Sequence, residues 1–152
     1  MFGKRVSEYL AFQKVPLILV AAMGLLRLGL SLAGLPVSTV RWFSMNLVGW
    51  AATLWYGVAV YKTGFGSYKQ LLPLGLFQMI VFQAVAVLGI GLAMAGLQNV
   101  YAAPEYSFPP PYGQGVHMAA HLTVGIVVPT LLIWGVASLV MLITKAVSPR
   151  RA

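Results

Sequence analysis

The sequence contains no cysteine and no aspartate, and its only acidic residues are Glu8 and Glu105. The lack of cysteine excludes disulfides, thiolate metal sites and cysteine nucleophiles within this chain. The lack of aspartate excludes a Ser-His-Asp triad, and the sequence offers no pair of carboxylates for general acid–base catalysis. The only conceivable catalytic set is Glu105 with the two histidines, so catalytic activity of this chain on its own is not expected.

Charge of either sign is scarce, whereas apolar residues are abundant. Charged residues make up 8% of the 152 residues and hydrophobic residues make up 60%. A membrane-spanning helix needs about 20 mainly apolar residues, and runs of this kind occupy residues 15–34, 40–61, 71–97 and 116–144. We therefore predict one all-α integral membrane domain over residues 1–152, folded as a four-helix transmembrane bundle.

The basic residues lie mainly where these runs end, so we attribute the net charge of +8 to topology and expect no nucleic-acid partner. Three segments carry most of them: the N-terminus (Lys4, Arg5, Lys14), the second connection (Lys62, Lys69) and the C-terminal tail (Lys145, Arg150, Arg151). The first connection has only Arg41, and the Pro-rich third connection, residues 99–115, has Glu105 and no basic residue. The positive-inside rule then predicts cytoplasmic N- and C-termini and an outer Pro-rich loop. We expect the chain to be an integral protein of a bacterial inner membrane.

Arg27 is the most unusual residue of the sequence, because it lies well inside an apolar run, where an arginine costs at least a few kcal/mol on insertion scales. Counting along a helix from Lys14 places Arg27 beyond the bilayer midplane, toward the outer face. Three interpretations stay open: snorkelling to outer headgroups, a buried partner such as an anionic cofactor, a lipid phosphate or an acid, and a water-filled path. Within the chain, only Glu105 is an acid on that side.

The two histidines, His117 and His121, are four residues apart and lie on one helical face at the outer side. That spacing can chelate a metal ion, although a stable site needs further ligands, for which Glu105 is the nearest carboxylate. Interfacial or capping roles, and an axial contact to haem or another tetrapyrrole shared with a second chain, are the alternatives.

The uncharged polar residues inside the predicted spans are Asn46, Gln78 and Gln83, which we expect to form interhelical hydrogen bonds. Pro129 falls near the middle of the fourth run and predicts a kink there.

Two functional hypotheses follow. The first is an accessory or structural subunit of a larger membrane assembly, or a homo-oligomer, with lipids and other membrane subunits as partners. The second is a binding or redox protein with an outer-leaflet pocket for a quinone, lipid, haem or metal, formed by Arg27, Arg41, Glu105, His117 and His121.

Overall fold

The computed structural model describes residues 1–103 and 113–148, which contain helices and no strand. The helices are α1 (Val6–Phe12), α2 (Lys14–Leu32), α3 (Val37–Val40), α4 (Met45–Thr63), α5 (Tyr68–Met94), η1 (Val100–Ala102), α6 (Gln114–Leu122) and α7 (Val124–Val147). Residues 104–112 and 149–152 lie outside the described part of the chain, and with them Glu105, Arg150, Arg151 and most of the Pro-rich loop.

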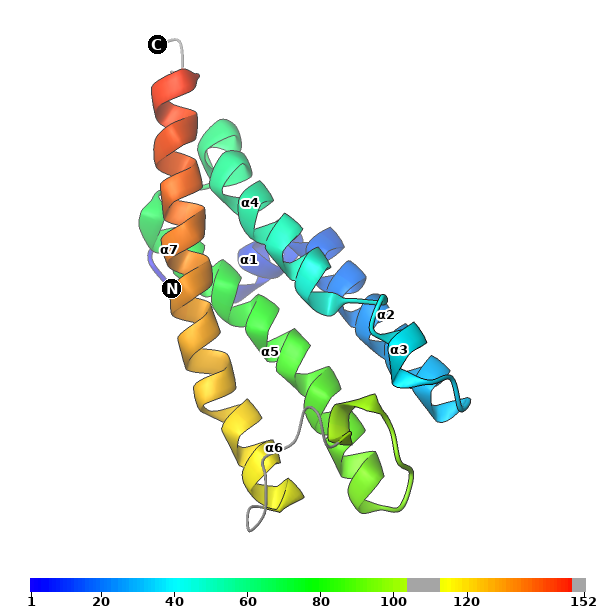
Figure 1. Ribbon diagram of the computed structural model, residues 1–152. Coiled ribbons are helices and arrows are strands. Elements are labelled where there is room, and N and C mark those ends of the chain that lie inside the picture. The colour runs from blue at the N-terminus through cyan, green and yellow to red at the C-terminus, as the bar shows by residue number, and fades with distance from the viewer. Residues whose placement is uncertain (104–112, 149–152) are drawn as a thin grey trace.

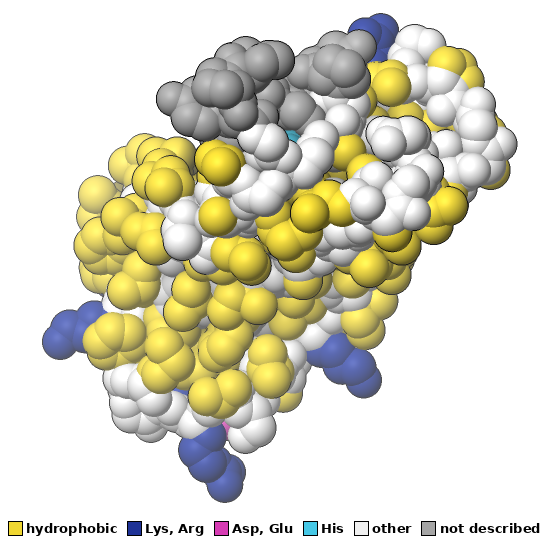
Figure 2. Space-filling view, turned by 90° about the horizontal axis from the view of Figure 1, so that it is seen from below, with side chains coloured by type: hydrophobic (Ala, Val, Ile, Leu, Met, Phe, Trp, Pro, Cys, Tyr) yellow, Lys and Arg dark blue, Asp and Glu magenta, His cyan; other side chains and the backbone are white. Residues whose placement is uncertain are grey.

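Three helices in the described ranges are long and apolar enough to cross a membrane: α2, α5 and the run Gln114–Val147, which comprises α6 and α7. This finding indicates a membrane protein, and Figure 2 shows hydrophobic side chains over most of one face, with Lys and Arg side chains at its margins. Helix α4 has the same length as α2, 19 residues, but it is less apolar because it includes Asn46, Lys62 and several aromatic residues.

The long helices pack side by side, with α4 against α7 and α2, and α5 against α7 and α2 (Figure 1). At one end of the bundle, Lys62 Nζ donates to Ser148 Oγ at 2.6 Å and Gln70 Nε2 donates to the Phe2 carbonyl at 2.8 Å. At the opposite end, the Val100 backbone N–H donates to Ser31 Oγ at 2.8 Å. The start of the chain and the end of α7 therefore share one end of the bundle.

Close helix packing forms the core near that shared end. The buried cluster consists of Tyr9, Ala52, Tyr56, Val60, Leu71, Leu74, Ala137 and Met141. Within it, α4 approaches α7 so closely that a Cβ on Gly57 would lie 2.6 Å from the Ala137 carbonyl oxygen. A small residue at this position allows the two backbones to meet, as in other membrane helix pairs.

The second long helix begins at Met45, later than the predicted start at residue 40. Pro36 is followed by the single turn of α3, after which Ser44 accepts the Leu47 backbone N–H at 3.4 Å and caps α4. Serine is favoured at this position because its hydroxyl satisfies a helix N–H that has no partner within the helix.

The fourth apolar run is interrupted at Thr123, between α6 and α7, whereas Pro129 lies inside the continuous helix α7. Thr123 has φ −115° and ψ −90°, and its hydroxyl donates to the Ala119 carbonyl at 2.8 Å. Back-bonding of this kind competes with the helical hydrogen-bond pattern. The helix is thus interrupted six residues before Pro129, at a position that was not singled out from the sequence.

Candidate functional site

The two histidines meet at the end of the bundle that α6 covers. Their side chains are on the same face of α6, with Nε2 of His121 3.0 Å from Nε2 of His117 and the ring centroids 4.8 Å apart. His117 is 6% exposed and His121 is half-buried. The sequence spacing therefore produces a contact between the two rings, not merely a shared face.

Gln83 of α5 holds His121 from the other side. Its Nε2 donates to the Gly125 carbonyl at 2.6 Å, and its Oε1 lies 2.5 Å from His121 Nδ1. The Gly125 carbonyl has no helical donor, because its partner four residues on is Pro129, which lacks an N–H. Gln83 supplies the missing donor, and this requirement sets the orientation of its amide.

The amide orientation determines the tautomer of His121. Since Nε2 of Gln83 donates to Gly125, its Oε1 is left as an acceptor, and Nδ1 of His121 carries the proton that it accepts. In the neutral ring, Nε2 of His121 then bears the lone pair and faces His117. On the far side of the pair, Nδ1 of His117 lies 3.3 Å from Oε1 of Gln114.

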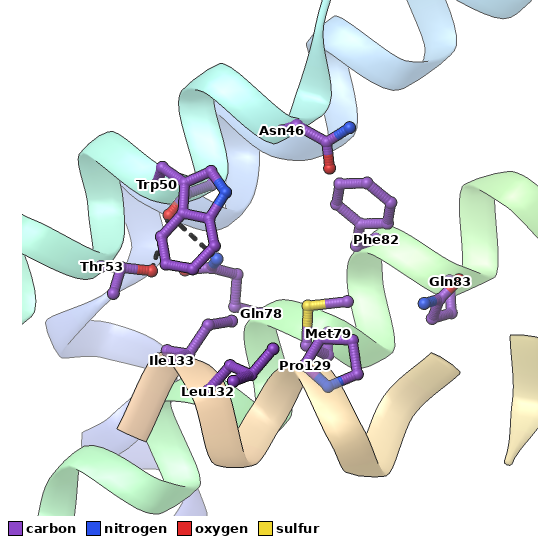
Figure 3. A pocket seen from close by; sticks show the side chains of 11 residues that line it. Asn46, Trp50, Thr53, Gln78, Met79, Phe82, Gln83, Pro129, Leu132 and Ile133 are labelled. Carbon is purple, nitrogen blue, oxygen red and sulfur yellow. Dashed lines mark hydrogen bonds between the residues drawn. The ribbon is translucent and has the colours of Figure 1, made fainter. Parts of the chain in front are cut away.

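A separate pocket of about 210 Å³ lies between α4, α5 and α7 (Figure 3). It is lined by Asn46, Gly49, Trp50, Thr53, Gln78, Met79, Phe82, Gln83, Pro129, Leu132 and Ile133. The three polar residues singled out in the predicted spans, Asn46, Gln78 and Gln83, all contribute to its wall. The structure thus brings them to one cavity, although Gln78 and Gln83 lie on different parts of the α5 surface.

Gln78 is an almost fully buried polar side chain of this wall, at 2% exposed. Its Nε2 donates to the Gly49 carbonyl of α4 at 3.1 Å, and that carbonyl also accepts from the Thr53 hydroxyl at 2.9 Å. Its Oε1 is buried with no hydrogen-bond partner in residues 1–103 and 113–148. A buried carbonyl oxygen left in this way costs about 1–3 kcal/mol, so Gln78 holds an unused acceptor behind the pocket wall.

The two arginines of the predicted site, Arg27 and Arg41, contact aromatic rings and are absent from the lining of this pocket. The Arg27 guanidinium carbon is 5.5 Å from the ring centroid of Tyr101, whose hydroxyl donates to the Gly24 carbonyl at 3.1 Å. Burial raises the pKa of Tyr101 to about 12, and the nearby Arg27 charge acts in the opposite direction. Arg41 is exposed and stacks over Trp42, with 5.4 Å from guanidinium carbon to ring centroid. Glu105, which was also part of the predicted site, lies outside the described residues.

Several site residues were not anticipated from the sequence: Gly49, Trp50, Thr53 and Phe82 in the pocket, and Gln114 beside His117. A signal for the pocket was present, because Asn46, Gly49, Trp50 and Thr53 follow helical spacing on one face of α4. The donor role of Gln83 toward the Gly125 carbonyl had no signal in the sequence, since it depends on which turn of α7 faces α5.

No group of three or more His, Cys, Asp or Glu side chains gathers in the part of the chain that the structure describes. Comparison with protein-family models, curated proteins and solved structures finds no match to this chain.

Proposed function

We propose that the chain crosses a bacterial inner membrane four times, with both ends in the cytoplasm, and that α4 is a span in addition to α2, α5 and the run Gln114–Val147. Two polar residues in the middle of α4, Thr53 and Tyr56, are fully buried against the other helices. Basic side chains gather at the end of the bundle where the chain starts and α7 finishes: Lys4 lies over Phe65, Lys62 bonds to Ser148 and Lys145 lies over Tyr68. Positive charge at that end supports a cytoplasmic position for it.

We further propose that the pocket between α4, α5 and α7 binds a quinone-type headgroup, that is, a flat uncharged ring carrying carbonyl or hydroxyl groups. The observation that carries this proposal is the combination of apolar and polar groups in one intramembrane wall. Trp50 and Phe82 offer aromatic surfaces, while Asn46 and Gln78 offer amide groups (Figure 3). Binding sites for small molecules are typically apolar cavities with a few placed polar groups.

The size of the pocket suits one ring. A dry cavity of about 150 Å³ in a protein core accepts benzene, and the pocket measures about 210 Å³. The Trp50 indole N–H and the Asn46 amide donate to carbonyl oxygens of the ring. The unused Oε1 of Gln78 is buried behind the pocket surface, and it accepts a hydroxyl of the reduced ring only when the Gln78 amide turns toward the pocket. Long isoprenoid tails stay outside in the lipid, where they need no protein contact.

Quenching of tryptophan fluorescence by a short-chain benzoquinone tests this proposal, with the purified protein in lipid nanodiscs. Trp50 lines the pocket, so a saturable component of quenching is expected in the native protein and should disappear in Trp50→Phe. Trp42→Phe is the matched control, because Trp42 is exposed at the connection before α4 and lies outside the pocket lining.

Quenching that rises linearly with quinone concentration in all three proteins reflects partition into the lipid and refutes a quinone site. Gln78→Leu provides a second readout, since it removes the polar group but retains the tryptophan. A weaker saturable affinity in that variant is expected, and an unchanged affinity would remove Gln78 from the binding wall.

The accessory-subunit hypothesis is the second proposal, and the surfaces of α2 and α7 support it. Both helices expose large apolar side chains to the outside of the chain, among them Ile18, Leu19, Leu25, Leu131, Leu132 and Leu139. Partner helices or lipid must cover these faces. The size of the native particle after mild extraction tests the proposal: hundreds of kilodaltons are expected for a subunit, and migration as a monomer in lipid contradicts it.

A further inference from the structure

The histidine pair on α6 has no part in the quinone proposal, and its geometry points to a ligand of its own. We infer that His117 and His121 form a binding site for a divalent transition metal ion of the Zn²⁺ or Cu²⁺ type, with their two Nε2 atoms as ligands. Imidazole nitrogen suits both ions, whereas Mg²⁺ and Ca²⁺ prefer oxygen.

The first support is the direction of the His121 lone pair. Gln83 accepts the Nδ1 proton of His121, which leaves Nε2 as the basic nitrogen of the neutral ring. Gln83 is itself held by the Gly125 carbonyl, so the imidazole is oriented by a side chain that is 5% exposed and bonded at both ends. Metal-binding histidines commonly have this arrangement, with one ring nitrogen on the ion and the other donating to an oxygen.

The second support is the matching arrangement at His117. Oε1 of Gln114 lies 3.3 Å from Nδ1 of His117, on the side of the ring away from His121. When both Nδ1 atoms carry protons toward amide oxygens, both Nε2 lone pairs point toward the same place. Two lone pairs at the observed 3.0 Å repel each other, and a cation bound between them removes that repulsion.

The third support is the distance between the two ligand atoms. Zn–N bonds of about 2.0–2.1 Å at a tetrahedral angle place two nitrogens about 3.3 Å apart. The observed separation of 3.0 Å is a few tenths of an ångström shorter. Small rotations of the two rings therefore produce a chelating pair without any change in the backbone of α6.

Two protein nitrogens leave coordination positions open for water or an exogenous ligand, unlike a closed structural zinc site. We therefore expect reversible binding of one ion per chain. Because the chain has only two histidines and no cysteine, the site is also the only His-based chelating pair that its sequence can provide.

The test uses full-length protein purified in mild detergent without a polyhistidine tag, since a tag would dominate metal binding. Equilibrium dialysis against Zn²⁺, followed by elemental analysis, should show one saturable ion per chain. Co²⁺ serves as a second probe, because histidine coordination gives visible absorption bands. His121→Gln should abolish both signals.

Gln83→Leu separates a metal site from a merely structural contact, since it keeps both ligands and removes the oxygen that orients His121. Zn²⁺ affinity should fall about tenfold to a hundredfold. Gln78→Leu is the matched control, because it makes the same change on the same helix and Gln78 bonds to Gly49 of α4 instead. Its Zn²⁺ affinity should equal that of the native protein.

Absence of saturable Zn²⁺ and Cu²⁺ binding by the native protein would overturn the inference, whether or not the variants fold. The contact between the two rings would then be a hydrogen bond in which one Nε2–H donates to the other Nε2. Binding that survives His121→Gln would also overturn it. The quinone proposal is independent of these results, because its readout depends on Trp50 and is measured without metal.

Discussion

Gln83 and Pro129 are expected to be energetically coupled through the Gly125 carbonyl. Gln83→Leu removes the donor to that carbonyl, at 2.6 Å, and the acceptor for His121 Nδ1, at 2.5 Å. Interhelical hydrogen bonds in membrane proteins contribute about 0.6 kcal/mol on average and up to about 1.7 kcal/mol, and a buried carbonyl without a donor costs about 1–3 kcal/mol. We expect the free energy of unfolding to fall by about 2 kcal/mol.

Pro129→Ala provides the rescue. An alanine at position 129 carries a backbone N–H, and α7 is continuous from Val124 to Val147, so this N–H lies where it can donate to the Gly125 carbonyl. In the Pro129→Ala background, Gln83→Leu should therefore cost only about 1 kcal/mol, which is the part due to His121. The expected coupling energy is therefore about 1 kcal/mol. The effects of independent mutations add to within roughly 0.3–0.5 kcal/mol, so a coupling of this size is measurable.

Reversible unfolding in mixed micelles, followed by circular dichroism, measures the four free energies of this cycle. If Gln83→Leu lowers the free energy of unfolding equally with proline or alanine at position 129, the Gly125 carbonyl does not need Gln83 as its hydrogen-bond donor. The assignment of the Gln83 amide, and with it the tautomer of His121, would then be refuted.

Three further predictions concern the packing and the N-terminal helix. Gly57→Ala should lower the free energy of unfolding by about 1–3 kcal/mol, since its methyl group meets a backbone carbonyl of α7, whereas Gly135→Ala, with open space around it, should have little effect in the same unfolding assay. Tyr56→Phe removes the 2.9 Å donor to Oε1 of buried Gln13 and should cost about 1–3 kcal/mol, but much less when Gln13→Met is also present; equal costs in both backgrounds would refute the pairing. A backbone N–H at the start of α1 holds the pKa of Glu8 below its ordinary value, so its stabilisation of α1 is present near neutral pH and is lost as pH falls through the lowered pKa. The protection factors of the α1 amides, which are exchange rates corrected for the intrinsic effect of pH on amide exchange, should fall between about pH 6 and about pH 3 in the native protein, and native protection factors as constant as those of Glu8→Gln would contradict this.

Much of the site could be anticipated as a set of residues, but not as an arrangement. The spacing of His117 and His121 predicted a shared helical face, and Gln78 and Gln83 stood out as polar residues in apolar runs. The sequence hypothesis grouped Arg27 and Arg41 with the histidines. In the structure Arg27 lies over Tyr101 and Arg41 over Trp42.

The surroundings of Pro129 show why rules based on neighbouring residues reach a limit. Proline removes a hydrogen bond wherever it occurs in a helix, yet α7 continues through Pro129 and the break is at Thr123. The carbonyl that Pro129 leaves without a donor is satisfied by Gln83, 42 residues earlier in the chain. A sequence rule that considers only neighbouring residues does not include that compensation.

Composition and hydropathy, which are sums over neighbouring residues, determined by themselves that this is a helical membrane protein and approximately where its long helices lie. The burial of backbone polar groups in lipid permits few alternatives for such apolar runs. Only the tertiary structure decided which polar atoms meet, because that depends on the rotation and separation of whole helices, which contacts such as Gly57 against α7 set. The meeting of Gln83 with His121 and Gly125, and the pocket beside it, are consequences of that packing.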